Sequence, residues 1–238
     1  MKSPLYYLNG PRILRFLKRT RREHSIRAAH KAHFKEHAND YKNLDLYVEN
    51  FRSSGGLNHQ FQAYKLWSLN KLLEKYKPKS ILEFGSGSST LVFAEYAKKN
   101  NAKVLSIDES EKWAANTLKL IGNQNPKYVD VVAKTRKFLP EKTPKEIKYD
   151  VEIKESFDFV LVDGPSLSVD GVKYKEAVNS NIFELPELPK VIVVDVRKAT
   201  ALEIAEKYGT HYNIELCDLL DDEPVPKNYN LFSVYTKK

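Results

Sequence analysis

Short apolar runs that alternate with longer amphipathic segments, from residue 80 onward, constrain the fold of this chain most strongly. We interpret seven runs as strands: 80–84, 103–108, 128–133, 157–163, 190–195, 212–216 and 231–236. Runs such as Ile192–Val194 are apolar at every position, which is typical of strands buried on both faces of a sheet. Apolar spacing also predicts helices at 89–99 and 111–121, the second closed by Gly122. This alternation predicts the α/β class, with a doubly wound, Rossmann-like, mostly parallel sheet.

The N-terminal part of the chain is set apart by its charge. The net charge is +8, and residues 1–43 hold 11 Lys or Arg against 3 Asp or Glu, which leaves 28 of each sign in the remainder. The sequence Asn9–Pro11 predicts a helix start, and Ile13, Leu14 and Leu17 would lie on one side of that helix. We expect a basic helical extension that docks on the domain. The alternatives for this segment are contact with an anionic membrane surface and contact with nucleic acid.

The length of 238 residues fits one sizeable α/β domain with a short extension. A turn at Ser53–Gly56 divides the chain, so we assign 1–52 to the basic helical extension and 53–238 to the domain. Within the domain, 58–76 carries apolar residues at helical spacing, and 134–156 is expected to hold a helix fragment with a loop or a small hairpin.

The apolar runs and the single cysteine indicate where in the cell the protein is expected and which kinds of site it can hold. No run of 18 apolar residues occurs, and the first ten residues lack the apolar stretch of a secretory signal. We therefore expect a cytoplasmic protein, with peripheral contact to a membrane as the alternative for its basic segment. The single cysteine, Cys217, excludes a disulfide framework and a metal cluster built on thiolates, and we interpret it as a packing residue.

A tight turn at Glu83–Gly87 follows the first predicted strand. In open α/β sheets, ligands bind beyond the carboxyl ends of the strands, beside the point where the strand order reverses. The two glycines of the turn let the backbone bend sharply and let a ligand approach the main chain, before a helix that Ser88 or Ser89 would cap. Asp108 ends the next predicted strand and would accept hydrogen bonds from ribose hydroxyls. The pattern therefore predicts a nucleoside cofactor.

The charges around this turn favour S-adenosylmethionine over a dinucleotide. Glu83 places a carboxylate at the mouth of the turn, where it would repel a pyrophosphate and attract an ammonium and a sulfonium group. Thr90 occupies the position at which dinucleotide-binding turns usually carry a third glycine. No Gly-Lys-Ser/Thr follows the turn, which excludes a Walker phosphate loop.

Two stretches of the chain resemble the class I S-adenosylmethionine-dependent methyltransferases. They are Ser80-Ile-Leu-Glu-Phe-Gly-Ser-Gly-Ser-Ser-Thr-Leu and Ser106-Ile-Asp-Glu-Ser-Glu-Lys-Trp. With Val162-Asp163-Gly164-Pro165 at the end of a strand, the chain is similar in particular to bacterial members that act on small molecules and sugars. The resemblance extends over about residues 55–235 and implies a seventh strand that runs antiparallel beside the fifth.

The resemblance also implies roles for the residues of the turn. Glu83 would hold the methionine amino group through water, and Asp108 would bind the ribose. The floor of the site would consist of Gly85, Ser86 and Gly87. We add three residues to the expected cofactor contacts: Ser89, Glu109 and Asp163. For Trp113, core packing is favoured over a place beside the adenosine.

Methyl transfer is an in-line displacement, so the protein must align the two substrates and remove the proton of the acceptor. Asp163, at the end of the fourth predicted strand, is the first choice for the base or for an orienting group. In related O-methyltransferases, carboxylates at the ends of the fourth and fifth strands bind a divalent metal, and Asp163 and Asp195 fit such a pair. Val194 stands where those relatives often carry a second acid, which argues against Mg²⁺. Asp195 would otherwise cap a helix or pair with Arg197.

Two loops are expected to enclose the acceptor. Residues 166–174 are predicted to form a mobile loop over it, because the segment is polar and follows Asp163 directly. Residues 53–59 would form the opposite wall, where His59 is a second choice for the general base because the pKa of histidine is ordinarily near neutrality. A surface or supporting role is the commoner outcome for such a histidine.

The predicted function is O-methylation of a small molecule or of a sugar hydroxyl, including a glycan on a membrane-linked carrier. An RNA or DNA methyltransferase that uses the basic segment is an alternative, although Asp163–Ser166 replaces the Asn/Asp-Pro-Pro-Tyr/Phe motif frequent in enzymes that methylate base nitrogens. A non-catalytic partner protein with the same fold and an NAD-dependent oxidoreductase are two further alternatives.

Overall fold

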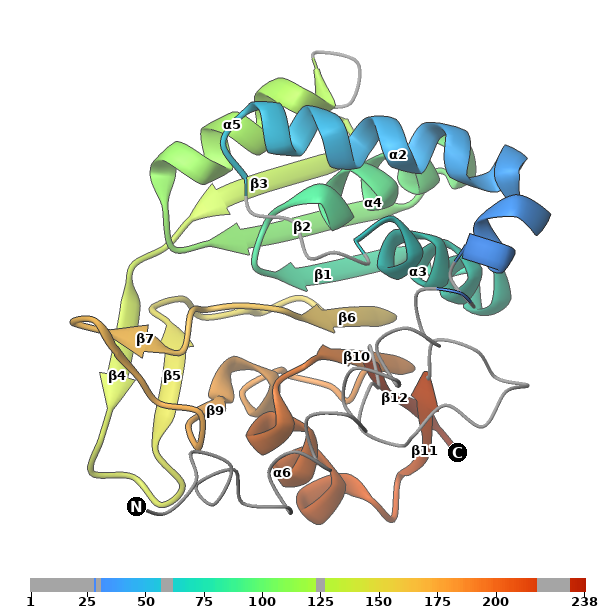
Figure 1. Cartoon of the computed structure of the whole chain (residues 1–238). Coiled ribbons are helices and arrows are strands. Elements are labelled where there is room, and N and C mark those ends of the chain that lie inside the picture. Colours follow the sequence, from blue (N-terminus) through green and yellow to red (C-terminus); the bar gives the residue numbers. More distant parts are fainter. Residues whose placement is uncertain (1–27, 29–30, 57–61, 123–126, 218–231) are drawn as a thin grey trace, which may run out of the picture.

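A computed structural model describes residues 28, 31–56, 62–122, 127–217 and 232–238 of the chain. Its largest sheet has seven strands (Figure 1). They are β1 (Ser80–Phe84), β2 (Lys103–Asp108), β3 (Val129–Ala133), β6 (Phe159–Val162), β10 (Val191–Asp195), β11 (Tyr212–Cys217) and β12 (Phe232–Lys237). Their order across the sheet is β11-β12-β10-β6-β1-β2-β3.

The strand directions confirm the predicted doubly wound sheet. β12, the seventh of these strands, runs antiparallel to β10, the fifth, and to β11, whereas the remaining pairs are parallel. The chain leads from β1 outward through β2 to β3 and then returns to β6 on the other side of β1. The strand order therefore reverses between β1 and β6, and their carboxyl ends border the crevice in which such sheets bind ligands.

Helices cover both faces of this sheet (Figure 1). One face carries α2 (Ala38–Ser53), α3 (Gln62–Tyr76), α4 (Ser88–Asn100) and α5 (Glu111–Ile121). The other face carries α6 (Lys198–Tyr208) and the short 3-10 helix η2 (Ser180–Phe183). None of the helices that the structure describes combines the length and the apolar character needed to cross a membrane.

The sequence of β1 shows how the two layers are specified. Side chains of a strand alternate between the faces of the sheet. Ile81 joins the core beneath α2–α5, whereas Leu82 and Phe84 join the core beneath α6. Full burial of such a side chain stabilises the fold by about 1.5–3 kcal/mol. Glu83 obeys the same alternation, so its carboxyl group points toward α4.

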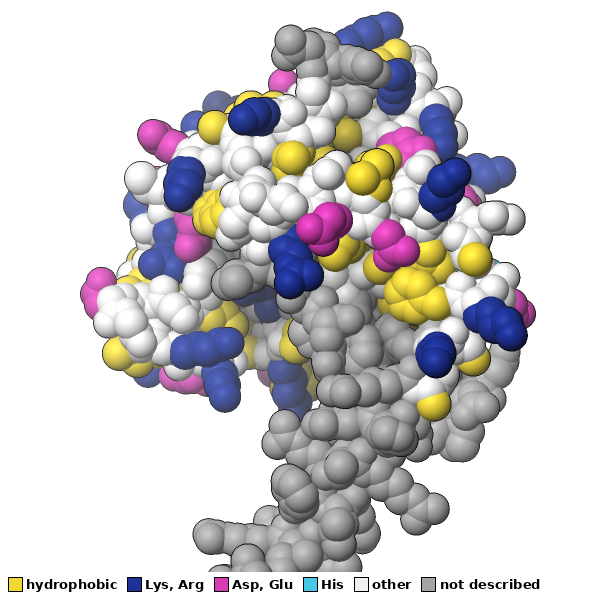
Figure 2. Space-filling model, turned by 45° about the horizontal axis from the view of Figure 1, so that its top comes forward, with side chains coloured by type: hydrophobic (Ala, Val, Ile, Leu, Met, Phe, Trp, Pro, Cys, Tyr) yellow, Lys and Arg dark blue, Asp and Glu magenta, His cyan; other side chains and the backbone are white. Residues whose placement is uncertain are grey.

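α2 packs against α3, α4 and α5, and its Tyr41 and Leu44 are buried in the core that these helices share with the sheet. The predicted boundary at residue 52 falls near the end of this helix. The helical extension expected from Ile13, Leu14 and Leu17 lies outside the described residues. Figure 2 shows the face that α2 and α5 cover, where Lys and Arg side chains are interspersed with Asp and Glu.

Two small sheets lie at the carboxyl-end side of the large sheet (Figure 1). β4 (Arg136–Leu139) and β5 (Glu146–Tyr149) form an antiparallel hairpin, which β9 (Val178–Asn179) extends. The small hairpin expected as one possibility for residues 134–156 is therefore present, and the expected helix fragment is not. β7 (Ser168–Val169) and β8 (Val172–Lys173) form a second hairpin where a loop was predicted, because Asp170 and Gly171 both adopt the positive φ that a tight two-residue turn needs.

Candidate active site

A cavity of about 880 Å³ lies beyond the carboxyl ends of β1, β2, β6 and β10. Six of the predicted site residues line it: Gly85, Ser86, Asp108, Glu109, Asp163 and Asp195. Three others do not belong to its lining: Glu83, Gly87 and Ser89. His59 lies outside the described residues. The cavity therefore joins the turn after β1, expected to hold the cofactor, to the acids expected to serve the acceptor.

The turn after β1 and the loop after β6 touch each other through two glycines. Gly85 has φ +100°, and a Cβ on it would lie 2.9 Å from the backbone of Asp163. A Cβ on Gly164 would lie 2.7 Å from the amide nitrogen of Gly85 and 2.2 Å from the hydroxyl of Tyr149. Since real Cβ atoms do not approach backbone atoms so closely, both positions require glycine. The contact fixes the position of the turn after β1 relative to the loop after β6.

The start of α4 differs from the expected serine cap. Gly87 is the residue that precedes the helix, and its amide donates to Oγ1 of Thr90 over 2.8 Å. Ser88 and Ser89 are already helical, and their hydroxyls face the protein interior. Ser88 accepts a hydrogen bond from Gln62, and Ser89 donates one to Glu83. The helix thus begins one residue earlier than the sequence pattern predicts.

The carboxyl group of Glu83 lies behind the turn and not at its mouth, contrary to the expectation. The side chain is fully buried and accepts hydrogen bonds from the hydroxyls of Ser89, Thr90 and Ser106, at 2.5–2.6 Å. Burial raises its pKa to about 7, the three hydroxyls oppose that rise, and the charge of Asp163 adds to it. The alternation of β1 explains the placement, because the residue before Phe84 must point toward α4.

Asp108 ties the end of β2 to the turn after β1. Its Oδ2 accepts from the amide and the hydroxyl of Ser86, at 3.0 and 2.8 Å. Its Oδ1 accepts from the amide of Ser110, at 2.9 Å. A carboxylate oxygen has room for two hydrogen bonds, so Oδ1 retains one lone pair toward the cavity that Asp108 lines. This capacity fits a ribose hydroxyl.

Trp113 lines the same side of the cavity, although the sequence favoured core packing. Its ring is half-buried and lies 6.0 Å from that of Phe51, centroid to centroid. Residues 53–56, the described part of the predicted opposite wall, do not line the cavity. Instead Gly55 lies behind Trp113, where a Cβ would contact the ring at 3.8 Å. The segment supports the wall and does not form it.

Glu109 connects the end of β2 to the β7–β8 hairpin. Its Oε2 accepts from the amide of Ser166 over 2.9 Å, and its Oε1 lies 3.5 Å from Arg136. Arg136 in turn donates to the carbonyl oxygens of Ser166 and Ser168, at 3.1 and 2.7 Å. Both charged groups thus hold the hairpin over the cavity.

The acids on the acceptor side have different partners from those expected. Asp195 is 6% exposed, and its Oδ2 accepts from the ammonium group of Lys65, which α3 contributes. Its Oδ1 has no hydrogen-bond partner in the part of the chain that the structure describes. Arg197 pairs with Asp163 at 3.6 Å and donates to the carbonyl oxygen of Pro165 at 2.8 Å. The predicted Asp195–Arg197 pair is therefore wrong: Asp195 pairs with the buried lysine of α3, and Arg197 pairs with Asp163.

The carboxyl group of Asp163 has a strongly raised pKa. Its side chain is 45% exposed and lines the cavity. Desolvation and the nearby Asp195 raise its pKa to about 7, against the opposing charges of Arg197 and Lys65. A carboxylate with a pKa near neutrality is suited to accept a proton at physiological pH.

These residues do not fit a divalent metal ion. Mg²⁺ binds through several oxygen ligands in an octahedral arrangement. Among the described residues, no group of three or more His, Cys, Asp or Glu side chains is arranged to hold an ion. The ammonium of Lys65 contacts Asp195 and would repel a second cation at the same carboxylate. Val194, where relatives often carry an acid, is buried within β10.

Sequence reasoning missed several residues of the site. Lys65 carried a usable signal, because it lies four residues before Leu69 on the apolar face of its helix, where an unpaired charge would be costly. Tyr149, Lys173 and Lys175 also line the cavity. They come from the two hairpins, whose positions depend on tertiary packing, and no local pattern distinguishes them.

The comparisons with known proteins bear on this geometry. No family model matches the chain, and no curated protein matches it by sequence. Among solved structures, it is similar to a candidate O-methyltransferase from Klebsiella pneumoniae (17% identity, 89% of this chain and 96% of that one, TM-score 0.57). A candidate caffeoyl-CoA O-methyltransferase from Staphylococcus aureus gives 12% identity, 87% and 98% coverage and a TM-score of 0.55.

A third structure, an O-methyltransferase from Bacillus cereus in complex with S-adenosylhomocysteine, is 18% identical. The match covers 82% of this chain and 90% of that one, with a TM-score of 0.51. At these identities the likeness concerns the fold. The chain has the class I methyltransferase fold, complete with the antiparallel strand β12.

Proposed function

We propose that this protein is an S-adenosylmethionine-dependent methyltransferase that transfers a methyl group to a hydroxyl of a small molecule or sugar. One observation carries the proposal: a single cavity joins a glycine turn with a ribose-type acid, Asp108, to a carboxyl pair, Asp163 and Asp195. The solved relatives are O-methyltransferases, one with S-adenosylhomocysteine bound, which supports the same cofactor here.

The residues on the β1–β2 side fit this cofactor. Gly85 lines the cavity, Asp108 retains a lone pair for a hydroxyl, and Trp113 offers an aromatic surface to a nucleoside. We infer that these residues, with Ser86 and Glu109, would hold the cofactor. When bound, S-adenosylmethionine supplies a methyl carbon activated by its sulfonium.

The residues on the β6–β10 side would prepare the acceptor. Asp163, with its pKa near 7, would take the proton of the acceptor hydroxyl. Asp195, whose charge raises the pKa of Asp163, would keep that carboxyl group able to exchange a proton near neutral pH. Lys65 places a positive charge at Asp195, where a metal ion would otherwise supply one. The proposal is therefore a metal-independent transfer.

Calorimetry tests the cofactor directly. Wild-type protein should bind S-adenosylhomocysteine and should not bind NAD. Asp108→Asn removes the charge that receives the ribose, and a hydrogen bond to a charged group is worth about 1.5–3 kcal/mol, so affinity should fall by about 10- to 100-fold. Asp130→Asn is the control, since Asp130 is exposed on β3 away from the cavity. Binding of NAD in place of S-adenosylhomocysteine would overturn the proposal.

A further inference from the structure

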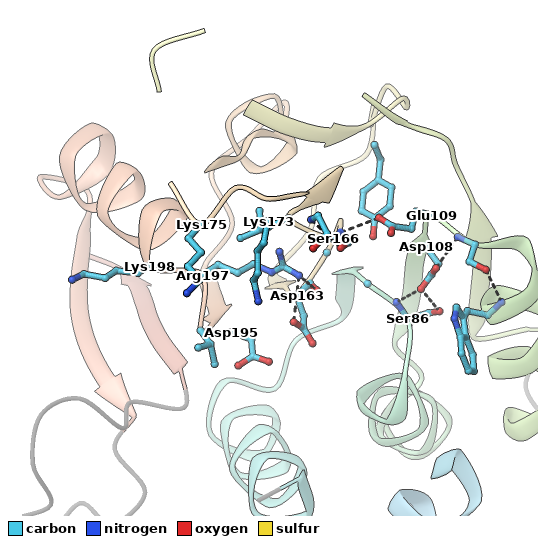
Figure 3. A pocket seen from close by; sticks show the side chains of 18 residues that line it. Ser86, Asp108, Glu109, Asp163, Ser166, Lys173, Lys175, Asp195, Arg197 and Lys198 are labelled. Atoms are coloured by element: carbon cyan, nitrogen blue, oxygen red, sulfur yellow. Dashed lines mark hydrogen bonds and ion pairs between the residues drawn. The ribbon is translucent and has the colours of Figure 1, made fainter. Parts of the chain in front are cut away.

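Three lysines line the part of the cavity that would receive the acceptor: Lys173, Lys175 and Lys198. Lys173 ends β8, Lys175 follows it by two residues, and Lys198 is the first residue of α6. All three are exposed, and none forms a hydrogen bond or ion pair through its side chain with a described residue. Figure 3 shows Lys173 and Lys175 reaching toward Asp163 and Asp195, with Lys198 at the outer edge.

The other charges on this side are balanced. Asp195 contacts Lys65, and Asp163 pairs with Arg197. Asp108 and Glu109 lie across the cavity beside Ser86 (Figure 3), where backbone amides contact both acids and Arg136 contacts Glu109, so they belong to the cofactor side. The acceptor side therefore keeps an excess of positive charge that no described acid neutralises.

We propose that the acceptor carries a phosphate group, which Lys173 and Lys175 bind. This inference rests on the proposed function and names its class of substrate. Lysine ammonium groups bind phosphate as point charges, and two of them on one side of a cavity match an anion that carries more than one charge. Arg197 does not add to them, because Asp163, Pro165 and Asn179 already occupy its guanidinium group.

The start of α6 adds to the positive potential. Arg197, the residue before this 11-residue helix, makes no side-chain hydrogen bond to its first amides. The first turn of a helix presents free N–H groups and a partial positive charge, which favour an anion. Lys198 belongs to this turn and lies at the outer edge of the cavity (Figure 3), so the start of α6 borders the side that Lys173 and Lys175 line.

Titration of pyrophosphate into protein saturated with S-adenosylhomocysteine tests the inference. The variant K173Q/K175Q keeps both side chains polar and removes two charges. An exposed ion pair contributes up to about 1 kcal/mol, so the double variant should bind pyrophosphate about tenfold more weakly. Its affinity for S-adenosylhomocysteine should not change.

The control is K119Q/K142Q, which removes the same charge from exposed positions on α5 and on the β4–β5 turn. Equal pyrophosphate affinity of the two double variants would overturn the inference, since the effect would then be one of net charge. Failure to bind S-adenosylhomocysteine would instead count against the proposed function, so the two ideas fail separately.

A second measurement distinguishes the source of the phosphate. Wild-type protein should bind a hexose phosphate but not the unphosphorylated hexose if the acceptor is soluble. If the phosphate belongs to a lipid headgroup, K173Q/K175Q should sediment less than K119Q/K142Q with vesicles of phosphatidylcholine and phosphatidylglycerol. Either result supports the inference, and the absence of both overturns it.

Discussion

Single residues set the chemistry that the site can perform, and Asp163 is the one whose surroundings matter most. Desolvation and Asp195 raise its pKa, while Arg197 and Lys65 prevent a larger rise. The balance leaves a carboxyl group that changes charge near pH 7. Glu83 also has a pKa of about 7. Its carboxyl group is buried, accepts hydrogen bonds from three hydroxyls and does not line the cavity. Of these two acids, only Asp163 can meet an acceptor.

Methyl transfer should therefore depend on the charge of Asp163. Below its pKa the group is protonated and cannot accept a proton, so the rate should rise with pH and level off above about 7. Asp163→Asn should lower the rate by about 10²- to 10⁴-fold and remove this pH dependence. The rate at which S-adenosylhomocysteine is formed, measured from pH 5.5 to 9, reports both the lower rate and the lost pH dependence.

Asp170→Asn is the matched control for that measurement, since Asp170 lies on the tip of the β7–β8 hairpin and outside the cavity lining. It should keep the wild-type profile. An Asp163→Asn variant with the wild-type rate and profile would exclude Asp163 as the base.

The Lys65–Asp195 pair is predicted to matter for stability as well as for the site. Removal of one member of a buried pair leaves the other charge uncompensated, so Lys65→Met should destabilise the protein by about 3–5 kcal/mol. The double variant K65M/D195N leaves no buried charge and should recover part of that loss. Lys71→Met, on the exposed face of the same helix, should cost no more than about 1 kcal/mol.

Urea unfolding of the four proteins measures these differences. Equal losses for Lys65→Met and Lys71→Met would show that the pair is not formed.

Because Lys65 supplies the positive charge at Asp195, chelation of divalent ions should also leave the wild-type transfer rate unchanged. A rate that falls with chelator and returns with Mg²⁺ would contradict the metal-independent transfer.

At the scale of elements, α2 belongs to the core that α3, α4 and α5 form with the sheet. Tyr41 is 1% exposed, and it packs with α3 and the sheet in one core. Trp113, which lines the cavity, also contacts this helix through Phe51, and Gly55, just after the helix, lies behind its ring. α2 therefore links the stability of the domain to the shape of the cofactor side.

Substitution of Tyr41 should accordingly destabilise the whole domain. Tyr41→Ala removes a buried aromatic ring, and truncations of this kind cost about 3–5 kcal/mol. Leu46→Ala, on the same helix with 55% exposure, should change stability by about 0.5 kcal/mol or less. Thermal unfolding followed by circular dichroism compares the two. Similar melting temperatures for both variants would mean that α2 does not belong to the cooperative unit.

At the scale of the whole molecule, the distribution of charge bears on partners. The face over α2 and α5 mixes both signs (Figure 2), so it offers no continuous basic surface to a polyanion. Residues 1–27 hold eight Lys or Arg against one Glu, and binding to nucleic acid would depend on them. The alternative function is thus tied to this segment.

A deletion of residues 1–27 tests that alternative and leaves Tyr41 and Leu44 in place. If the full chain binds RNA or DNA, the affinity should fall steeply with salt, and the deletion should abolish it. Gel-shift titrations from 50 to 300 mM salt would measure this. Nucleic-acid affinity that survives the deletion would move the binding site to the domain, and S-adenosylhomocysteine binding serves as the control for folding.

The large sheet of this protein could be predicted from its sequence, because its seven strands and the glycines of the turn after β1 are specified locally. Apolar runs such as Val191–Val194 must be buried on both faces, and the alternation with helices allows few other arrangements. Gly85, Asp108 and Asp163 could be placed in the site for the same reason, since each ends or directly follows a predicted strand whose carboxyl end borders the crevice.

Only the tertiary structure decided which charges meet. Lys65 and Asp195 are 130 residues apart, and Glu83 meets its three hydroxyl partners only when α4 and β2 pack beside β1. Lys173 and Lys175 reach the cavity because two hairpins fold over it. Local patterns fix backbone geometry through sterics and burial, whereas electrostatic partners depend on distances that arise when distant elements pack together.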